Sequence, residues 1–219
     1  MEPFDLHNAS VLARGFFARD TVVVARELLG KVLVSRVGDT VTGGRIVEAE
    51  AYLGTDDPGS HAATKGITRR NAIMYGPAGT AYVYFTYGNH HMFNVVTETE
   101  GVAGAVLVRA IEPLVGVDVM TARRKGRPVR ELCNGPGKLT AALGITLADN
   151  GVELGCGRLD VLDSREPIGR IVEGGRVGLS AGHDLPLRFF VADNGYVSNG
   201  RTGPRPRTRT AGRDGKVKA

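Results

Sequence analysis

Two carboxylates and a tyrosine alternate along one short segment, as Glu48, Glu50 and Tyr52. Alternate residues of a strand lie on the same face, which would place the two carboxylates roughly 7 Å apart, with the ring beside them. Carboxylate pairs at about this distance hydrolyse glycosidic bonds, although a solvated strand face has the same pattern. The tyrosine favours a pocket for a flat ring, because stacking on a nucleobase contributes about 1–3 kcal/mol.

One arginine, Arg109, interrupts an otherwise apolar segment at residues 103–111. A buried guanidinium is costly unless a carboxylate, a phosphate or ordered water satisfies it. The partner is either a structural glutamate or a group of the site. In both cases the segment of Arg109 should approach the acidic segment around Glu50.

Five of the six tyrosines fall between residues 52 and 87. Tyr82 and Tyr84 would share one face of a strand, where tyrosines usually pack as amphipathic sheet residues. Tyr87 differs because it is predicted at the turn of a hairpin, where a large ring has little of its own fold to contact. Such a ring is suited to insertion into a base stack.

Metal and phosphate motifs are weak in this chain. His61, His90 and His91 lack metal-ligand spacing, and Cys133 and Cys156 stand 23 positions apart, so we expect no metal, no cofactor and reduced thiols. The segment around Lys138 fails the spacing of a phosphate-binding loop but could hold one phosphate at a helix N-terminus.

The elements that must position these residues are short helices and strands. Helices are predicted at residues 20–30 with Asp20 as cap, at 113–124 with Pro113 near the first position, and at 133–144, ended by Gly144. Strands are predicted at residues 31–37, 44–54, 80–86, 91–97, 103–111, 158–162, 176–179 and 187–191.

In the strand at residues 44–54, the core face should consist of Val47, Ala49, Ala51 and Leu53. The irregular connection at residues 54–79 is long enough to be functional. Together the elements predict an α+β fold with a mixed, largely antiparallel curved sheet, flanking helices and a protruding β-hairpin. We expect a single domain at residues 1–199 and a basic, disordered tail at 200–219.

The charge of the chain is concentrated in that tail. Seven of the 28 basic residues and one of the 23 acidic residues lie at 200–219, so the other 199 residues carry 21 basic and 22 acidic side chains. The overall charge of +5 therefore does not by itself indicate nucleic acid. No signal peptide or membrane-length apolar run is visible, and we expect a cytoplasmic protein without membrane contact.

The segment from Arg45 to Gly54, followed by His61, strongly resembles the alkyladenine (3-methyladenine) DNA glycosylase family. The match covers about residues 14–198. It continues through Arg70-Asn71, Met74, Gly79–Tyr84, Tyr87-Gly88, Asn94, Val106–Pro113, Gly135–Leu139, Arg176–Gly178 and Pro186–Phe189.

The resemblance implies a monofunctional glycosylase of base excision repair, which flips alkylated or deaminated purines from duplex DNA and hydrolyses the N-glycosidic bond. Glu50 would activate the water and Arg109 would help to position it. Tyr52 and Tyr84 would sandwich the flipped base. His61 would lie at its edge, and Asn94 would screen purines from the pocket floor.

The expected partner is damaged double-stranded DNA, bound by a monomer. The resemblance implies that Tyr87 fills the gap left in the duplex. A body with a net charge of −1 must hold the DNA backbone through locally placed cations, for which Arg69, Arg70 and Lys138 are candidates.

Two other functions remain open from the residues alone. A hydrolase of free nucleosides or small N-glycosides would use the same carboxylate but would not need Tyr87. A non-catalytic nucleic-acid-binding module would use the aromatic side chains only for stacking.

Overall fold

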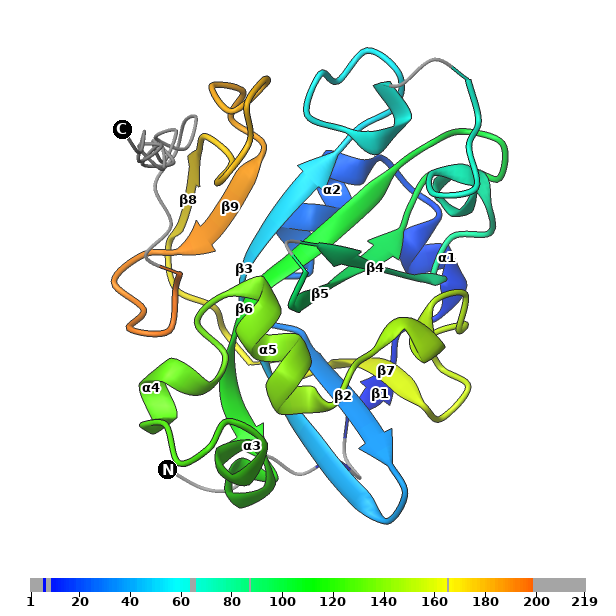
Figure 1. Cartoon of the computed structure of the whole chain (residues 1–219). Helices are drawn as coiled ribbons and strands as arrows, with labels where there is room; N and C mark the ends of the chain where they lie inside the picture. Colours follow the sequence, from blue (N-terminus) through cyan, green and yellow to red (C-terminus); the bar gives the residue numbers. More distant parts are fainter. Residues whose placement is uncertain (1–5, 7–8, 64–65, 87, 165, 199–219) are drawn as a thin grey trace, which may run out of the picture.

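The computed structural model describes residues 6, 9–63, 66–86, 88–164 and 166–198, which fold around one curled sheet (Figure 1). The strands are β1 (Ser10–Val11), β2 (Val32–Val37), β3 (Thr40–Tyr52), β4 (Ala81–Thr86), β5 (His90–Val96), β6 (Ala105–Val115), β7 (Leu159–Asp163), β8 (Ile171–Gly174) and β9 (Arg188–Val191). Their order is β1-β7-β2-β3-β6-β5-β4, and β9 joins β3 to β8. Every pairing of these strands is antiparallel, which confirms the predicted class of sheet.

Short helices accompany this sheet. They are α1 (Arg14–Phe17), α2 (Thr21–Glu27), α3 (Val117–Arg123), α4 (Val129–Leu132) and α5 (Pro136–Leu143), with 3-10 turns η1 (His61–Ala63), η2 (Ala72–Tyr75) and η3 (Leu147–Asp149). Asp20 caps α2 as predicted, by accepting hydrogen bonds from the amides of Val22 and Val23. Helices α3, α4 and α5 gather near the end of β6 and contact one another (Figure 1).

The two long central strands, β3 and β6, change register beside the acidic segment. Ile46 pairs with Ile111, Glu48 with Ala110 and Ala49 with Val108, so Val47 and Arg109 are each an extra residue. Extra residues of this kind re-aim side chains and are frequent next to active sites. Here they place Arg109 against the glutamates of β3.

The predicted core face of β3 is confirmed for Ala49, Ala51 and Leu53 and is wrong for Val47, because of this irregularity. Ile46, Ala49 and Ala51 belong to the main core, whereas Val47 packs in a separate cluster with Ala110 and Val191. The strict alternation predicted from the sequence fails because one extra residue reverses the faces.

Two further predicted elements differ from the structure. Pro113 lies inside β6, and α3 begins only at Val117. Proline is tolerated there because β5 pairs with β6 only over residues 105–107, so that, among the described residues, no strand pairs with β6 on that side at Pro113. Residues 176–179 form no strand, since Arg176 is drawn into a buried ion pair instead.

The predicted β4–β5 hairpin is confirmed, with pairing from Ala81↔Val95 to Thr86↔His90. It packs on α5, where the hydroxyl of Thr140 donates to the carbonyl of His91 at 3.0 Å. Helix α5 ends at Gly144, in the left-handed conformation with φ 68°, as predicted. Tyr87 and residues 200–219 lie outside the described residues, so their predicted roles remain predictions.

Candidate active site

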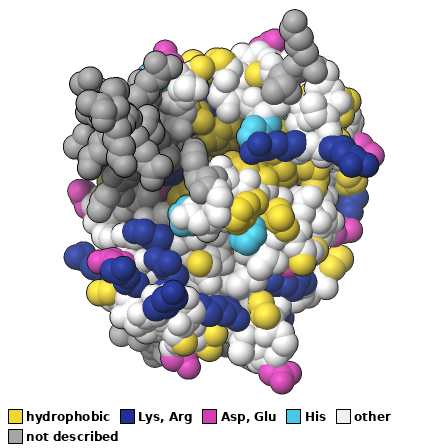
Figure 2. Space-filling view, in the orientation of Figure 1, with side chains coloured by type: hydrophobic (Ala, Val, Ile, Leu, Met, Phe, Trp, Pro, Cys, Tyr) yellow, Lys and Arg dark blue, Asp and Glu magenta, His cyan; other side chains and the backbone are white. Residues whose placement is uncertain are grey.

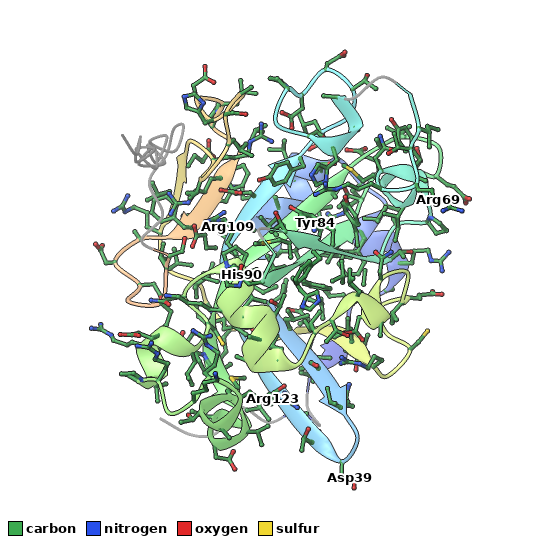
Figure 3. The ribbon with its side chains drawn as sticks, viewed as in Figure 1. Asp39, Arg69, Tyr84, His90, Arg109 and Arg123 are labelled. Atoms are coloured by element: carbon green, nitrogen blue, oxygen red, sulfur yellow. The ribbon has the colours of Figure 1, made fainter. Side chains whose placement is uncertain are left out.

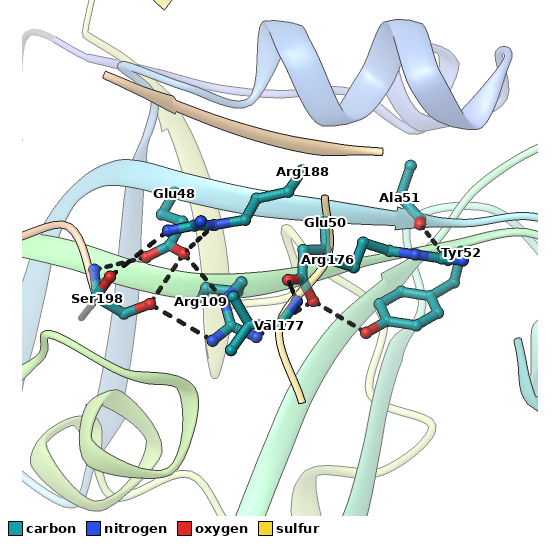
Figure 4. Close-up of polar contacts among 9 residues, drawn as sticks. All are labelled: Glu48, Glu50, Ala51, Tyr52, Arg109, Arg176, Val177, Arg188 and Ser198. Carbon is teal, nitrogen blue, oxygen red and sulfur yellow. Dashed lines mark hydrogen bonds and ion pairs between the residues drawn. The ribbon is translucent and has the colours of Figure 1, made fainter. Parts of the chain in front are cut away.

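An arginine lies between two glutamates in the middle of the sheet. Arg109 donates from Nε to Glu48 at 3.0 Å and from Nη1 to Glu50 at 3.2 Å (Figure 4). Glu48 and Glu50 are fully buried and Arg109 is 5% exposed. The expectation that these two segments approach each other is confirmed, and the solvated-face alternative is wrong. The two carboxylates raise the pKa of Arg109 against the opposing effect of burial.

Glu48 is saturated by donors from the last part of the described chain. Besides Arg109, it accepts hydrogen bonds from Arg188 Nε at 2.7 Å and from the amide and hydroxyl of Ser198 at 2.7 and 2.9 Å. These contacts leave it little capacity to take a proton from water. Its role is to hold Arg109 and to tie the segment of Ser198 to the sheet.

Glu50 has a different set of partners. Its Oε1 accepts from the amide of Val177 at 2.7 Å, and its Oε2 accepts from Arg109 and from the Tyr52 hydroxyl, the latter at 2.9 Å. Burial and the nearby Glu50 raise the pKa of Tyr52 well above its ordinary value, so Tyr52 remains a neutral donor.

The partners of Glu50 line a cavity of about 280 Å³, while Glu50 itself lies directly behind them. A second cavity, of about 60 Å³, adjoins it and shares Tyr52, His61 and Tyr84. Its other lining side chains include Asn94, Met74 and Tyr82. The structure therefore brings together the carboxylate, the arginine and all four predicted base-pocket residues. It also adds Tyr82, for which the sequence predicts only a packing role.

His61 lies at the edge of this aromatic pocket. Its Nδ1 is 2.7 Å from the Tyr82 hydroxyl, and its ring packs edge-on against Tyr84 with centroids 4.8 Å apart. Burial, with a contribution from the positive charge of Arg70, lowers the pKa of His61 to about 4. The imidazole is therefore neutral at neutral pH.

Asn94 is fixed by its own hairpin. It is 3% exposed, and its Nδ2 donates to the carbonyl of Tyr82 at 3.0 Å across the β4–β5 pair. This bond orients the amide at the wall of the smaller cavity. A side chain held in this way can select ligands by shape and hydrogen bonding.

The Tyr52 ring is supported by a buried ion pair. The guanidinium of Arg176 lies 4.7 Å from the ring centroid and donates to both oxygens of Asp57 at 2.5 and 2.6 Å. Burial opposes ionisation of Asp57, but hydrogen bonds from Arg176 and from two backbone amides lower its pKa. Neither residue is predicted from the sequence as part of the site, because the two are 119 positions apart.

The three predicted backbone cations occupy different positions. Arg70 lies over Tyr84, 5.0 Å from the ring centroid, and lines the larger cavity. Arg69 is exposed on the same connection (Figure 3). Lys138 lies in the first turn of α5 and donates to Asn134 at 2.7 Å.

Within the part of the chain that the structure describes, no three His, Cys, Asp or Glu side chains form a group that could hold a metal ion. Across those same residues, no helix has the length and apolar character needed to cross a membrane.

A buried carboxylate–arginine pair behind an aromatic pocket suits an enzyme that holds a flat base and cuts its glycosidic bond. The sequence model of the family described as "Methylpurine-DNA glycosylase (MPG)" matches residues 15–195, and the chain belongs to this family. It is thus a DNA glycosylase, a hydrolase of N-glycosyl bonds that acts in DNA repair.

Several relatives carry the name "Putative 3-methyladenine DNA glycosylase". The protein of Methanoculleus marisnigri is 51% identical over 191 residues, which is 85% of this chain and 98% of that protein. The protein of Carboxydothermus hydrogenoformans is 47% identical over 190 residues, covering 86% of this chain and 98% of its own. The protein of Koribacter versatilis is 46% identical over 195 residues, covering 87% and 94%.

Proposed function

We propose that this chain is a monofunctional glycosylase of base excision repair that excises alkylated and deaminated purines, such as 3-methyladenine, 7-methylguanine and hypoxanthine, from duplex DNA. It acts as a monomer in the bacterial cytoplasm, where the nucleoid lies. The observation that carries this proposal is the position of Glu50, whose three bonded partners line an aromatic cavity.

The pocket receives the base after it has left the duplex. Extruding a nucleotide costs a few kcal/mol, and stacking between Tyr52 and Tyr84 recovers a comparable amount. Alkylated purines that carry positive charge gain further from the electron-rich rings. Asn94 screens the base at the pocket wall, and Tyr87 occupies the gap in the duplex.

The reaction replaces the C1′–N bond of the nucleotide with a C1′–O bond from water. Glu50 takes the proton of the water, and Arg109 positions this carboxylate and the water. The base leaves with the electron pair of the broken bond, while the carboxylate stabilises the oxocarbenium-like sugar. The products are a free base and an abasic site.

Protonation of the leaving base separates the two lesion classes. A cationic alkylated purine departs without an added proton, whereas hypoxanthine departs more easily when protonated. His61 is neutral at neutral pH, since its pKa is about 4. His61 therefore contacts the edge of the base and does not act as the general acid that protonates the leaving base at neutral pH.

The first test is base release from duplex DNA by wild type and by Glu50→Gln under single-turnover conditions. Removing a general base slows the chemical step by about 10²–10⁴-fold. Glu27→Gln is the matched control, because Glu27 forms an exposed ion pair with Arg19 and lines none of the three cavities. This variant should retain the wild-type rate. A folded Glu50→Gln protein that works at the wild-type rate contradicts the assignment.

Two further measurements distinguish the alternatives. Borohydride trapping of a covalent DNA adduct would show lyase chemistry and refute the monofunctional part. Tyr87→Ser should impair release from duplex DNA, whereas a hydrolase of free nucleosides would keep its activity.

A further inference from the structure

A cavity of about 800 Å³ lies between the end of α3, the start of α4 and the first turn of α5. It shares no lining residue with the two cavities of the active site. Its lining contains one carboxylate, that of Glu131, and five cationic side chains. These are Arg123, Arg124, Lys125, Arg127 and Lys138.

Little negative charge in this lining offsets the cations. Within the described residues, its one ion pair joins Arg127 to Glu131 at 3.8 Å, and both side chains are exposed. Lys138 donates to a neutral amide, that of Asn134. Arg124 has a buried Nε without a hydrogen-bond partner among the described residues. A group of cations in this state attracts an anion.

The backbone between α3 and α4 builds the cavity. Lys125 and Gly126 both adopt the left-handed conformation, with φ 55° and 74°. A lysine rarely adopts this conformation, and such strain is frequent where a segment binds a ligand. This turn reverses the direction of the chain, so that Arg124, Lys125 and Arg127 line the same cavity.

Arg123 forms the fixed wall of this space. It donates to the carbonyl of Ala142 and to the hydroxyl of Thr40, each at 3.1 Å. These bonds tie α3 to α5 and to the start of β3. The cationic lining is therefore anchored on the same sheet as the active site.

The cavity lies beside the active site, on the same face of the molecule. Figure 2 shows Lys and Arg side chains gathered in the lower left, below the hydrophobic and His side chains of the centre. In Figure 3, His90 lies between Arg123 and Arg109. The first turn of α5 links the two sites, because Pro136 lines the larger active-site cavity and Lys138 lines the basic one.

We propose that this basic cavity binds the phosphodiester backbone of the duplex next to the flipped nucleotide. The inference rests on the proposed action on duplex DNA and extends the contact surface beyond the base pocket. The cavity is too large for a single phosphate, and its charged lining does not suit a flat apolar ring. Arginine and lysine together match a run of phosphates.

The test is the salt dependence of binding to an undamaged duplex by the full chain and by Arg124→Gln/Lys125→Gln. The logarithm of the binding constant falls as the logarithm of the salt concentration rises. Each phosphate contact that a variant no longer makes reduces the magnitude of this negative slope by about 0.9. If both cations contact phosphates, the affinity deficit of the variant should be about tenfold larger at 50 mM than at 200 mM salt. If this variant does not fold, Lys125→Gln/Arg127→Gln removes two exposed cations instead.

The matched control is Arg26→Gln/Arg170→Gln, which removes the same charge at two exposed positions outside all three cavities. A cavity variant with the same slope as this control overturns the proposal. So does a cavity variant that loses binding of inorganic phosphate but keeps the wild-type slope on DNA, because the ligand is then a free phosphate. Binding to undamaged DNA needs no catalysis. The salt dependence therefore tests the basic cavity alone, whereas the rate of base release tests the assignment of Glu50.

Discussion

At the residue scale, the site depends on one guanidinium that serves two carboxylates. Arg109 uses Nε for Glu48 and Nη1 for Glu50, so its fork geometry sets the distance between the two groups. Glu48 is in turn held by Arg188 and Ser198. Arg109 thus connects the catalytic carboxylate that we propose to a purely structural cluster.

This arrangement predicts a strong and graded response to substitution of Arg109. Arg109→Ala leaves two buried carboxylates without their shared partner and should lower the free energy of unfolding by about 3–5 kcal/mol. Arg109→Lys keeps the charge but cannot reach both carboxylates in the same way, so it should lose less stability and still release base more slowly. Urea unfolding and single-turnover rates measure the two effects.

The control for this series is Arg127→Ala, which breaks an exposed pair with Glu131 and should change the unfolding free energy by less than about 1 kcal/mol. An Arg109→Ala protein with the wild-type urea midpoint would show that the cluster does not stabilise the fold.

Many residues of the site can be predicted from the sequence, and others cannot. Glu50, Tyr52 and Arg109 are indicated by their type and spacing, and the family resemblance adds His61 and Asn94. Three further partners reach the site only through the fold, and neither their type nor their spacing indicates a role, although two of them fall in segments that carry the resemblance. They are Val177, Arg188 and Ser198. A backbone amide or an isolated polar side chain of this kind has no periodic pattern to reveal it.

At the element scale, the register of β3 against β6 determines whether the site forms. The extra residues Val47 and Arg109 set the alignment of Glu50 with its partner strand. An earlier irregularity lies at Gly43/Gly44, where β3 runs very close to β6. A Cβ at Gly44 would lie 2.4 Å from the carbonyl oxygen of Glu112.

Gly44→Ala should therefore disturb the strand pair far from any ligand. The new methyl group would clash with the backbone of Glu112, which cannot rotate aside as a side chain can. We therefore expect the free energy of unfolding to fall by about 1–3 kcal/mol. Base release should fall as well, because Glu50 and Arg109 lie farther along the same two strands. Urea unfolding and single-turnover kinetics test both expectations.

Gly15→Ala provides the comparison, since a Cβ there meets no heavy atom within 4 Å and the position lies in α1. Alanine in a helix should be neutral or stabilising by up to about 1 kcal/mol. Equal stability of the Gly44→Ala and Gly15→Ala proteins would mean that β3 and β6 can move apart at Gly44 without loss of stability, which would contradict the prediction.

The elements show where prediction from the sequence fails. The β4–β5 hairpin and α5 are predictable because local turn and cap residues determine them. The bulges of β3 and β6 and the strand position of Pro113 are not, because they depend on which neighbouring strands are present. Pairing between distant strands is a tertiary property that overrides local pattern.

At the scale of the whole molecule, charge is unevenly distributed. Residues 1–199 carry 21 basic and 22 acidic side chains, yet five of the cations line one cavity. Four of these five lie in the basic run at residues 123–127, which is visible in the sequence. The sequence predicts the antiparallel α+β fold but not that this run lines a cavity together with Lys138, because its pattern favours a single helix over residues 113–124. The turn at Lys125 and Gly126 creates the cavity, and no residue pattern indicates a left-handed lysine.

The basic segment at residues 200–219 should contribute to non-specific binding of DNA. Removing it takes away seven basic residues and one acidic residue, so non-specific DNA affinity and its salt slope should both fall. The base-release rate at saturating DNA should remain that of the full chain, because every residue of the active site precedes this segment. If the cavity and the segment contact different phosphates, the slope reductions of the truncated and cavity-variant proteins should add when the changes are combined. An unchanged slope after truncation would mean that the segment does not contact DNA. A combined reduction smaller than the sum would mean that the two compete for the same phosphates.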